Sequence, residues 1–143
     1  MFLGEYAHTI DNKGRLQIPK KFRGDLAGGA TISRGLDGCL FLYPKNLWAE
    51  FEAKLVNLPI TKADARVFSR HMLAGAYEVA VDRIGRLLIP PSLRQYAGLK
   101  EEVVVIGVGK RLELWDKIRW QEYRQQVESN SEETAERLGE LGI

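Results

Sequence analysis

Hydrophobic and polar side chains alternate with a period of two in two pairs of short segments. The alternating apolar or aromatic positions are Tyr6, His8, Ile10, Leu16 and Ile18 in the first pair and Tyr77, Val79, Val81, Leu87 and Ile89 in the second. This period is typical of half-buried β-strands. The gap within each pair contains a glycine, Gly14 or Gly85, which can adopt the positive φ of a tight turn. Each pair of segments therefore predicts a β-hairpin.

The remaining strands follow from short apolar runs bounded by turn residues, and the helices from apolar residues at helical spacing, such as Leu47, Phe51 and Leu55. Further strands are expected at 30–33, 40–43, 103–106 and 112–115, short helical turns at 20–26 and 90–97, and helices at 45–56, 61–73 and 117–128. Asp116 precedes the last of these helices and is predicted to cap it. Strands mixed with helices in this proportion predict a β-rich α+β fold.

The chain is internally duplicated. Residues 4–19 and 75–90 agree at eight of sixteen positions, where roughly one match is expected by chance. Each copy is therefore one structural unit. We expect a first repeat at 5–47 whose helix continues to about 57, a linker helix at 60–75, a second repeat at 76–119 whose helix continues to about 128, and an acidic C-terminal tail at 129–143.

A basic segment follows the first predicted strand. Its five basic side chains, with no acidic one among them, are Lys13, Arg15, Lys20, Lys21 and Arg23. Such a run is often only a solvated face. Against this stands its location, because a protruding β-ribbon is one of the few elements that fits the DNA major groove. An arginine can also donate two hydrogen bonds to a guanine edge. We expect Arg15 and Lys13 to reach bases, and Lys20, Lys21 and Arg23 to neutralise phosphates.

Asp11 and Asp82 are interpreted as structural residues of the two turns. Each is followed four residues later by an arginine, Arg15 or Arg86, and the glycine lies between them. The carboxylate is expected to accept hydrogen bonds from turn N–H groups and from the arginine, which favours its ionised form. The pair is therefore not interpreted as catalytic carboxylates.

Composition limits the possible classes of protein. The net charge of +2 is small, the one cysteine (Cys39) cannot form an internal disulfide, and no apolar run approaches 18 residues. A reducing, cytoplasmic environment is therefore expected, with no membrane span and no secretion signal. His8 and His71 lack partners at catalytic spacing, and metal-type spacings of Cys and His do not occur. The chain is predicted to be no enzyme and to need no metal or cofactor.

The motifs together resemble the MraZ family of bacterial transcriptional regulators. The resemblance is carried by the two Asp-x-x-x-Arg motifs and by the segments 1–6, 40–44, 82–99 and 112–116, and it extends to about Val127. It implies an AbrB-like swapped-hairpin (double-split) β-barrel with pseudo-two-fold symmetry. It also implies a ring of several subunits, associated with the nucleoid. This ring would bind short direct repeats upstream of the operon for cell division and wall synthesis that the regulator itself heads.

By the same resemblance, the DNA-reading residues are Lys13, Gly14 and Arg15, with Arg86 as the arginine of the second motif. Ile84 replaces the lysine in that motif, which favours a poorer reading turn or packing against a neighbouring subunit. The alternative is an antitoxin-like or scaffolding module that uses the same fold to bind a protein. No small-molecule substrate is expected in either case.

Overall fold

The computed structural model describes the whole chain, residues 1–143. The strands are β1 (Phe2–Thr9), β2 (Arg15–Gln17), β3 (Ala30–Arg34), β4 (Leu40–Pro44), β5 (Tyr77–Val79), β6 (Arg86–Leu88), β7 (Glu102–Gly109) and β8 (Leu112–Asp116). The helices are α1 (Arg23–Leu26), α2 (Lys45–Val56), α3 (Ala63–Ala74), α4 (Pro91–Ala97), α5 (Lys117–Glu128) and α6 (Ser131–Arg137), with short 3-10 helices η1 (Lys20–Phe22) and η2 (Gly139–Leu141). The chain thus has a mixed α+β fold.

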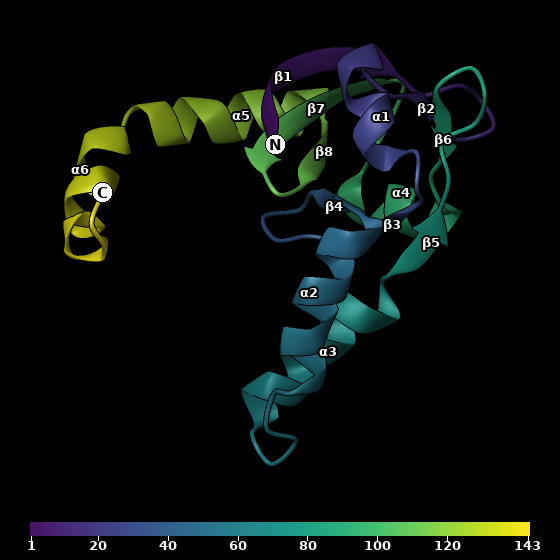
Figure 1. Cartoon of the computed structure of the whole chain (residues 1–143). Helices are drawn as coiled ribbons and strands as arrows, with labels where there is room; N and C mark the ends of the chain where they lie inside the picture. The colour runs from purple at the N-terminus through teal and green to yellow at the C-terminus, as the bar shows by residue number, and fades with distance from the viewer.

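Six strands form one antiparallel sheet in the order β1-β7-β8-β4-β3-β5. The first strand of each repeat pairs with a strand of the other repeat: β1 with β7 over eight residues, and β5 with β3 over three. The two halves are therefore interlocked, and neither builds a sheet of its own (Figure 1).

The remaining two strands, β2 and β6, pair with each other in a separate antiparallel ribbon. The prediction that each pair of segments forms a local hairpin was wrong about the partner strand. A single bridge between Ile10 and Leu16 is all that joins the first pair directly. β2 instead continues across to the other half of the chain and pairs with β6. The closed barrel implied by the resemblance is also absent, because β1 and β5 remain edges of an open sheet.

Buried side chains form two clusters. The larger one contains Leu16, Ile18, Leu87 and Ile89, all with no exposed surface, together with side chains of β1, β3, β4, β7 and β8. It anchors the β2–β6 ribbon to the sheet. The smaller cluster is aromatic and contains Phe41, Tyr43, Trp48, Met72 and Trp115. Here α2 and α3 pack together, and the helix predicted at 45–56 is confirmed as α2.

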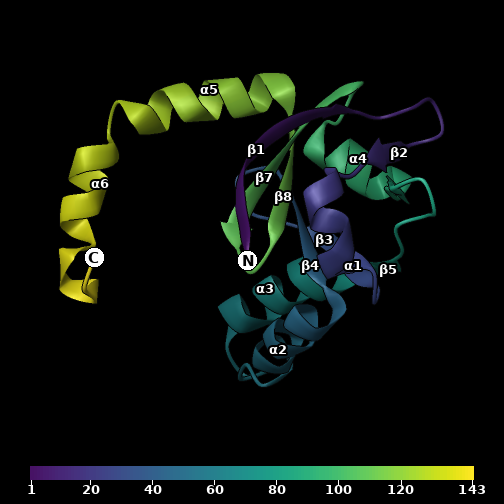
Figure 2. The same cartoon turned by 45° about the horizontal axis from the view of Figure 1, so that its top comes forward.

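The helices after the second repeat behave differently from α2 and α3. Asp116 caps α5, as predicted, by accepting a hydrogen bond from the N–H of Arg119. The acidic segment then forms α6 and η2, and α6 buries no residue. In two views the α5–α6 arm extends away from the body, while the two turns protrude at the opposite end (Figures 1 and 2). The acidic segment therefore does not cover the basic turns of its own chain.

Candidate nucleic-acid interface

The first turn, residues 11–15, is closed by its own backbone and by Asp11. The N–H of Asp11 donates to the carbonyl of Arg15 at 3.0 Å, and the N–H of Gly14 donates to the carbonyl of Asp11 at 3.0 Å. Asp11 Oδ1 accepts hydrogen bonds from the backbone N–H groups of Lys13 (2.9 Å) and Arg15 (3.0 Å). Gly14 has a φ of 87°, a conformation that residues with a Cβ rarely adopt. The turn therefore needs both residues where they stand.

The same carboxylate orients the arginine. Asp11 Oδ2 accepts a hydrogen bond of 2.8 Å from Arg15 Nε. The N–H of Arg15 is the largest cause that lowers the pKa of Asp11, which falls to about 2 from its ordinary 3.8. The aspartate is therefore ionised at neutral pH. The terminal nitrogens of Arg15 make no hydrogen bond within the chain, so an oriented guanidinium is left with unused donors.

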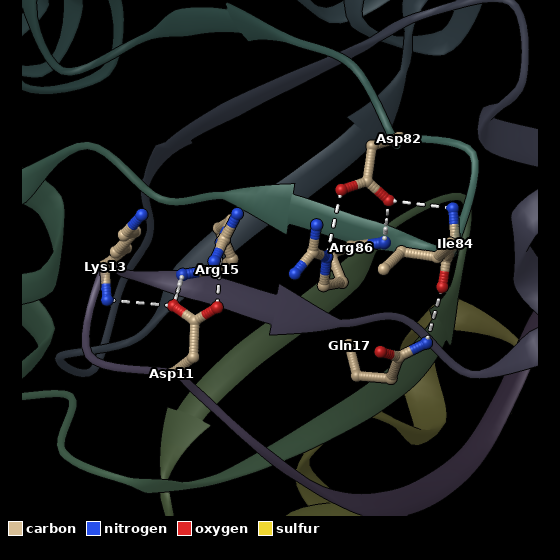
Figure 3. Close-up of polar contacts among 7 residues, drawn as sticks. All are labelled: Asp11, Lys13, Arg15, Gln17, Asp82, Ile84 and Arg86. Carbon is tan, nitrogen blue, oxygen red and sulfur yellow. Dashed lines mark hydrogen bonds and ion pairs between the residues drawn. The ribbon is translucent and has the colours of Figure 1, made fainter.

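The second turn, residues 82–86, repeats this geometry. Asp82 Oδ1 accepts hydrogen bonds from the backbone N–H groups of Ile84 (3.0 Å) and Arg86 (2.8 Å). Its Oδ2 accepts a hydrogen bond of 3.0 Å from Arg86 Nε. The N–H of Arg86 is again the largest cause that lowers the pKa of Asp82. Gly85 has a φ of 84°. Figure 3 shows both aspartates with their arginines at opposite ends of the ribbon.

The β2–β6 ribbon has one buried and one outer face. Leu16 lies opposite Leu87, and both are fully buried. Because successive residues of a strand point to opposite faces, the flanking pairs point outward. These pairs are Arg15 with Leu88 and Gln17 with Arg86. The outer face therefore carries both motif arginines between the two turns, with Arg15 on β2 in one flanking pair and Arg86 on β6 in the other.

Each turn is also held by the other half of the chain. The N–H of Ile18 donates to the carbonyl of Gly85 at 2.8 Å, and the N–H of Ile89 donates to that of Gly14 at 2.9 Å. Both glycines are buried.

A guanidinium from the opposite half lies over each glycine. A Cβ placed on Gly14 would meet the guanidinium of Arg94, and one placed on Gly85 would meet that of Arg23. Arg23 Nε donates to the carbonyl of Ile18, and Arg94 Nε donates to that of Ile89. These two arginines thus connect the strand end of their own half to the turn of the other.

The basic residues expected to contact phosphate lie in different settings. Lys20 is exposed on η1, and its side chain makes no hydrogen bond or ion pair within the chain. Lys21 is exposed, but its Nζ donates to the hydroxyl of Tyr6 at 2.7 Å and lies over the rings of Tyr6 and Phe22. Arg23 is half-buried under the second turn, as described above. Lys20 is therefore the most available of the three.

No group of three or more His, Cys, Asp or Glu residues is placed to hold a metal ion. None of the helices combines the length and the apolar character that a bilayer crossing requires.

A family model and full-length relatives both match this chain. The family model of the MraZ protein, described as antitoxin-like, matches residues 1–71 and again residues 72–141. The chain belongs to the MraZ family. The "Transcriptional regulator MraZ" of Moorella thermoacetica is 51% identical to it over 143 residues, which is the whole of both chains. The protein of that name from Thermoanaerobacter pseudethanolicus is 50% identical over the same length.

A solved structure gives a much weaker likeness. The solution structure of PHS018 from Pyrococcus horikoshii is 19% identical, with a TM-score of 0.32, and the match covers 80% of this chain and 88% of that one. A likeness at this level supports no statement about the fold of this member of the MraZ family.

Sequence reasoning missed three residues near the motifs. Gln17 and Leu88 share the outer face of the ribbon with the arginines, and the alternation around Leu16 and Leu87 could have placed them there. Arg94 stands at the repeat position of Arg23, since 23 plus the repeat length of 71 gives 94. The repeat could therefore have suggested a shared role, although no sequence signal indicated that each arginine crosses to the opposite half.

Proposed function

We propose that this chain is a sequence-specific DNA-binding transcriptional regulator that uses the outer face of the β2–β6 ribbon. One observation carries the proposal: two arginines on a protruding ribbon are each oriented by an ionised aspartate and keep their terminal nitrogens unused. A two-stranded ribbon fits the major groove, where guanine offers two acceptors to a guanidinium. Relatives about half identical over the full length are named transcriptional regulators. This supports a role in transcription regulation.

The roles of the residues follow from their positions. Arg15 contacts a base edge, and Lys13 at the turn tip reaches a base or the adjacent phosphate. Gly14 keeps the turn in the shape that presents them. Arg86 is the second base-reading arginine. Lys20, and more weakly Lys21, neutralise backbone phosphates, whereas Arg23 acts on the second turn, with its charge close to the DNA.

The arrangement of the halves fits the swapped-hairpin exchange of the AbrB-like fold. β2 and β6 each leave the preceding strand and pair across the pseudo-symmetry of the chain. One ribbon of this size makes few base contacts, so a single chain binds weakly. A ring of chains that places several ribbons on successive direct repeats gains affinity through effective concentration. We propose that these repeats lie in the promoter of the regulator's own cell-division and cell-wall operon.

A footprint over the region upstream of the chain's own gene tests the proposal. Regularly spaced protected segments are expected, and their protection should weaken as salt is raised because phosphate contacts release counterions. Light scattering in the same buffer should give a mass of several subunits. The Lys20→Ala variant should lower the slope of log affinity against log salt by about 1 without changing which repeats are protected.

The rival function is an antitoxin-like or scaffolding module, favoured by the description of the family model as antitoxin-like. A module of that kind uses its exposed surfaces for a protein partner. It would leave no protected repeat at any salt concentration, and that result would contradict the regulator proposal.

A further inference from the structure

The outer face of the β2–β6 ribbon is chemically divided. By the repeat of 71 residues, Lys13 corresponds to Ile84 and Gln17 corresponds to Leu88. The first half therefore presents hydrogen-bonding side chains at two positions where the second half presents aliphatic ones. Ile84 is 59% exposed and Leu88 is 56% exposed. No element of the chain covers either of them.

Single exposed apolar residues are common on protein surfaces and need no explanation. These two are different because they stand at the repeat positions of Lys13 and Gln17, beside the arginines proposed to contact DNA. Leu88 lies directly opposite Arg15 in the ribbon, and Arg86 lies between Ile84 and Leu88 along the chain. A ligand that contacts the two motif arginines therefore also contacts the two aliphatic side chains.

Duplex DNA offers one apolar feature in its major groove, the C5-methyl group of thymine. Opposite residues of an antiparallel pair have Cα atoms about 4.5 to 5.5 Å apart, and successive bases rise by about 3.4 Å. A side chain opposite Arg15 therefore reaches the base step that Arg15 contacts, or the one beside it. Burying a methyl group there is favourable, because apolar surface leaves water.

We propose that Ile84 and Leu88 recognise thymine through its methyl group. The inference rests on the proposed function and adds the base that the second half of the ribbon selects. The recognised word then combines a base that accepts hydrogen bonds from Arg15 or Arg86 with a neighbouring thymine. In this account Ile84, at the position that Lys13 has in the first half, changes which base is recognised, while DNA contact is kept.

Replacement of thymine by deoxyuridine tests this directly, because deoxyuridine pairs identically and lacks only the methyl group. The probe is the protected promoter duplex, synthesised with deoxyuridine at each thymine in turn. For the unaltered protein, at least one replacement should lower affinity about fourfold, the transfer value of one methyl group. In the Ile84→Ala/Leu88→Ala double variant, the same replacement should have no effect.

Two controls separate this role from others. Val67→Ala truncates an aliphatic side chain of similar exposure, 63%, on α3, away from the ribbon, and should keep the full thymine preference. Arg15→Ala should bind more weakly but keep the ratio between the two duplexes. Melting curves and light scattering of the double variant check that its fold and its mass are unchanged.

Three results would overturn the inference. They are equal binding of thymine and deoxyuridine duplexes at every position, a preference that survives in the double variant, and a loss of mass in that variant, which would make the patch a contact between copies. In each of these cases the duplex itself is still bound, so the proposed function stands. If the unaltered protein protects no DNA at all, the proposed function fails together with this inference.

Discussion

The two turns of the ribbon share the residues that build them and differ in the residues that face outward. Asp11 and Asp82 make the same three hydrogen bonds, all between 2.8 and 3.0 Å, to equivalent groups. At the tips, Asn12 and Lys13 stand in the first turn where Arg83 and Ile84 stand in the second. The comparison teaches that the two copies share the residues that close the turn and differ at the turn tips.

The difference continues along the chain after each turn. Lys20 and Lys21 follow the first strand of the ribbon, and Pro91 and Ser92 occupy the corresponding places in the second half. The first half of the proposed interface is therefore the more cationic, although Arg83 places an exposed positive charge at the tip of the second turn. The two halves are therefore expected to contribute unequally to DNA binding but equally to the stability of the turns.

The largest effect is expected from the motif arginines. Arg15→Ala should cost about 1 to 3 kcal/mol of DNA-binding free energy per engaged ribbon and relax sequence preference, because a bidentate base contact is lost. Arg86→Ala should cost less, since its half of the ribbon has no counterparts of Lys13, Lys20 and Lys21. Gel shifts at matched salt measure both. If Arg86→Ala bound DNA more weakly than Arg15→Ala, the second half would contribute more to binding than the first, contrary to the proposal.

The turn glycines should matter equally in both halves. Gly14→Ala and Gly85→Ala each place a Cβ at positive φ, at a cost of about 1 to 2 kcal/mol in the free energy of unfolding. Each Cβ also displaces the guanidinium that lies over it. Chemical denaturation measures the loss. Gly24→Ala is the matched control, because a Cβ there meets no atom within 4 Å and the residue lies in α1. A large difference in the free energy of unfolding between Gly14→Ala and Gly85→Ala would show that the two turns are not structurally equivalent.

Arg94→Ala should weaken operator binding by about 1 kcal/mol without removing a DNA contact. The variant loses the hydrogen bond to Ile89 and the cover over Gly14, so the first turn is less well held. The slope of affinity against salt should stay unchanged, because no phosphate contact is lost. A lower slope would instead indicate that Arg94 itself binds phosphate.

Trypsin offers a test of this crossed arrangement that needs no DNA. Arg94→Ala should speed cleavage after Lys13 in the first turn, and Arg23→Ala should speed cleavage after Arg83 in the second. Faster cleavage in the turn of the same half would contradict the crossed connection.

Acid should affect the first turn more than the second, and this is the smallest effect expected. The pKa of Asp11 is lowered to about 2 in the folded protein, so its contribution to stability is complete above its ordinary value of 3.8. That contribution is lost as the pH falls through about 2. Melting temperatures between pH 5 and pH 2 should therefore fall less in Asp11→Asn than in the unaltered protein. Asp82→Asn should show the same direction with a smaller change. Parallel curves for all three proteins would contradict this.

The amino-acid sequence by itself determined the local structure of this protein. The period of two placed Leu16 and Leu87 in the core, the 3.6-residue pattern placed the helix at 45–56, and Asp116 marked the start of α5. These features depend on bonds and packing among residues close in the chain, so a short window of sequence contains their cause. The repeat likewise indicated that the two turns are closed in the same way.

Only the tertiary structure decided which strand β2 pairs with and where the arginines of each half lie. A strand offers the same backbone donors and acceptors to any partner, so alternation shows which face is buried but not which strand lies alongside. The pairing of β2 with β6 brought Arg15 beside Leu88 and Gln17 beside Arg86, and carried Arg94 over Gly14. These neighbours lie 69 to 80 residues apart in the sequence, and their contact depends on how the two halves interlock.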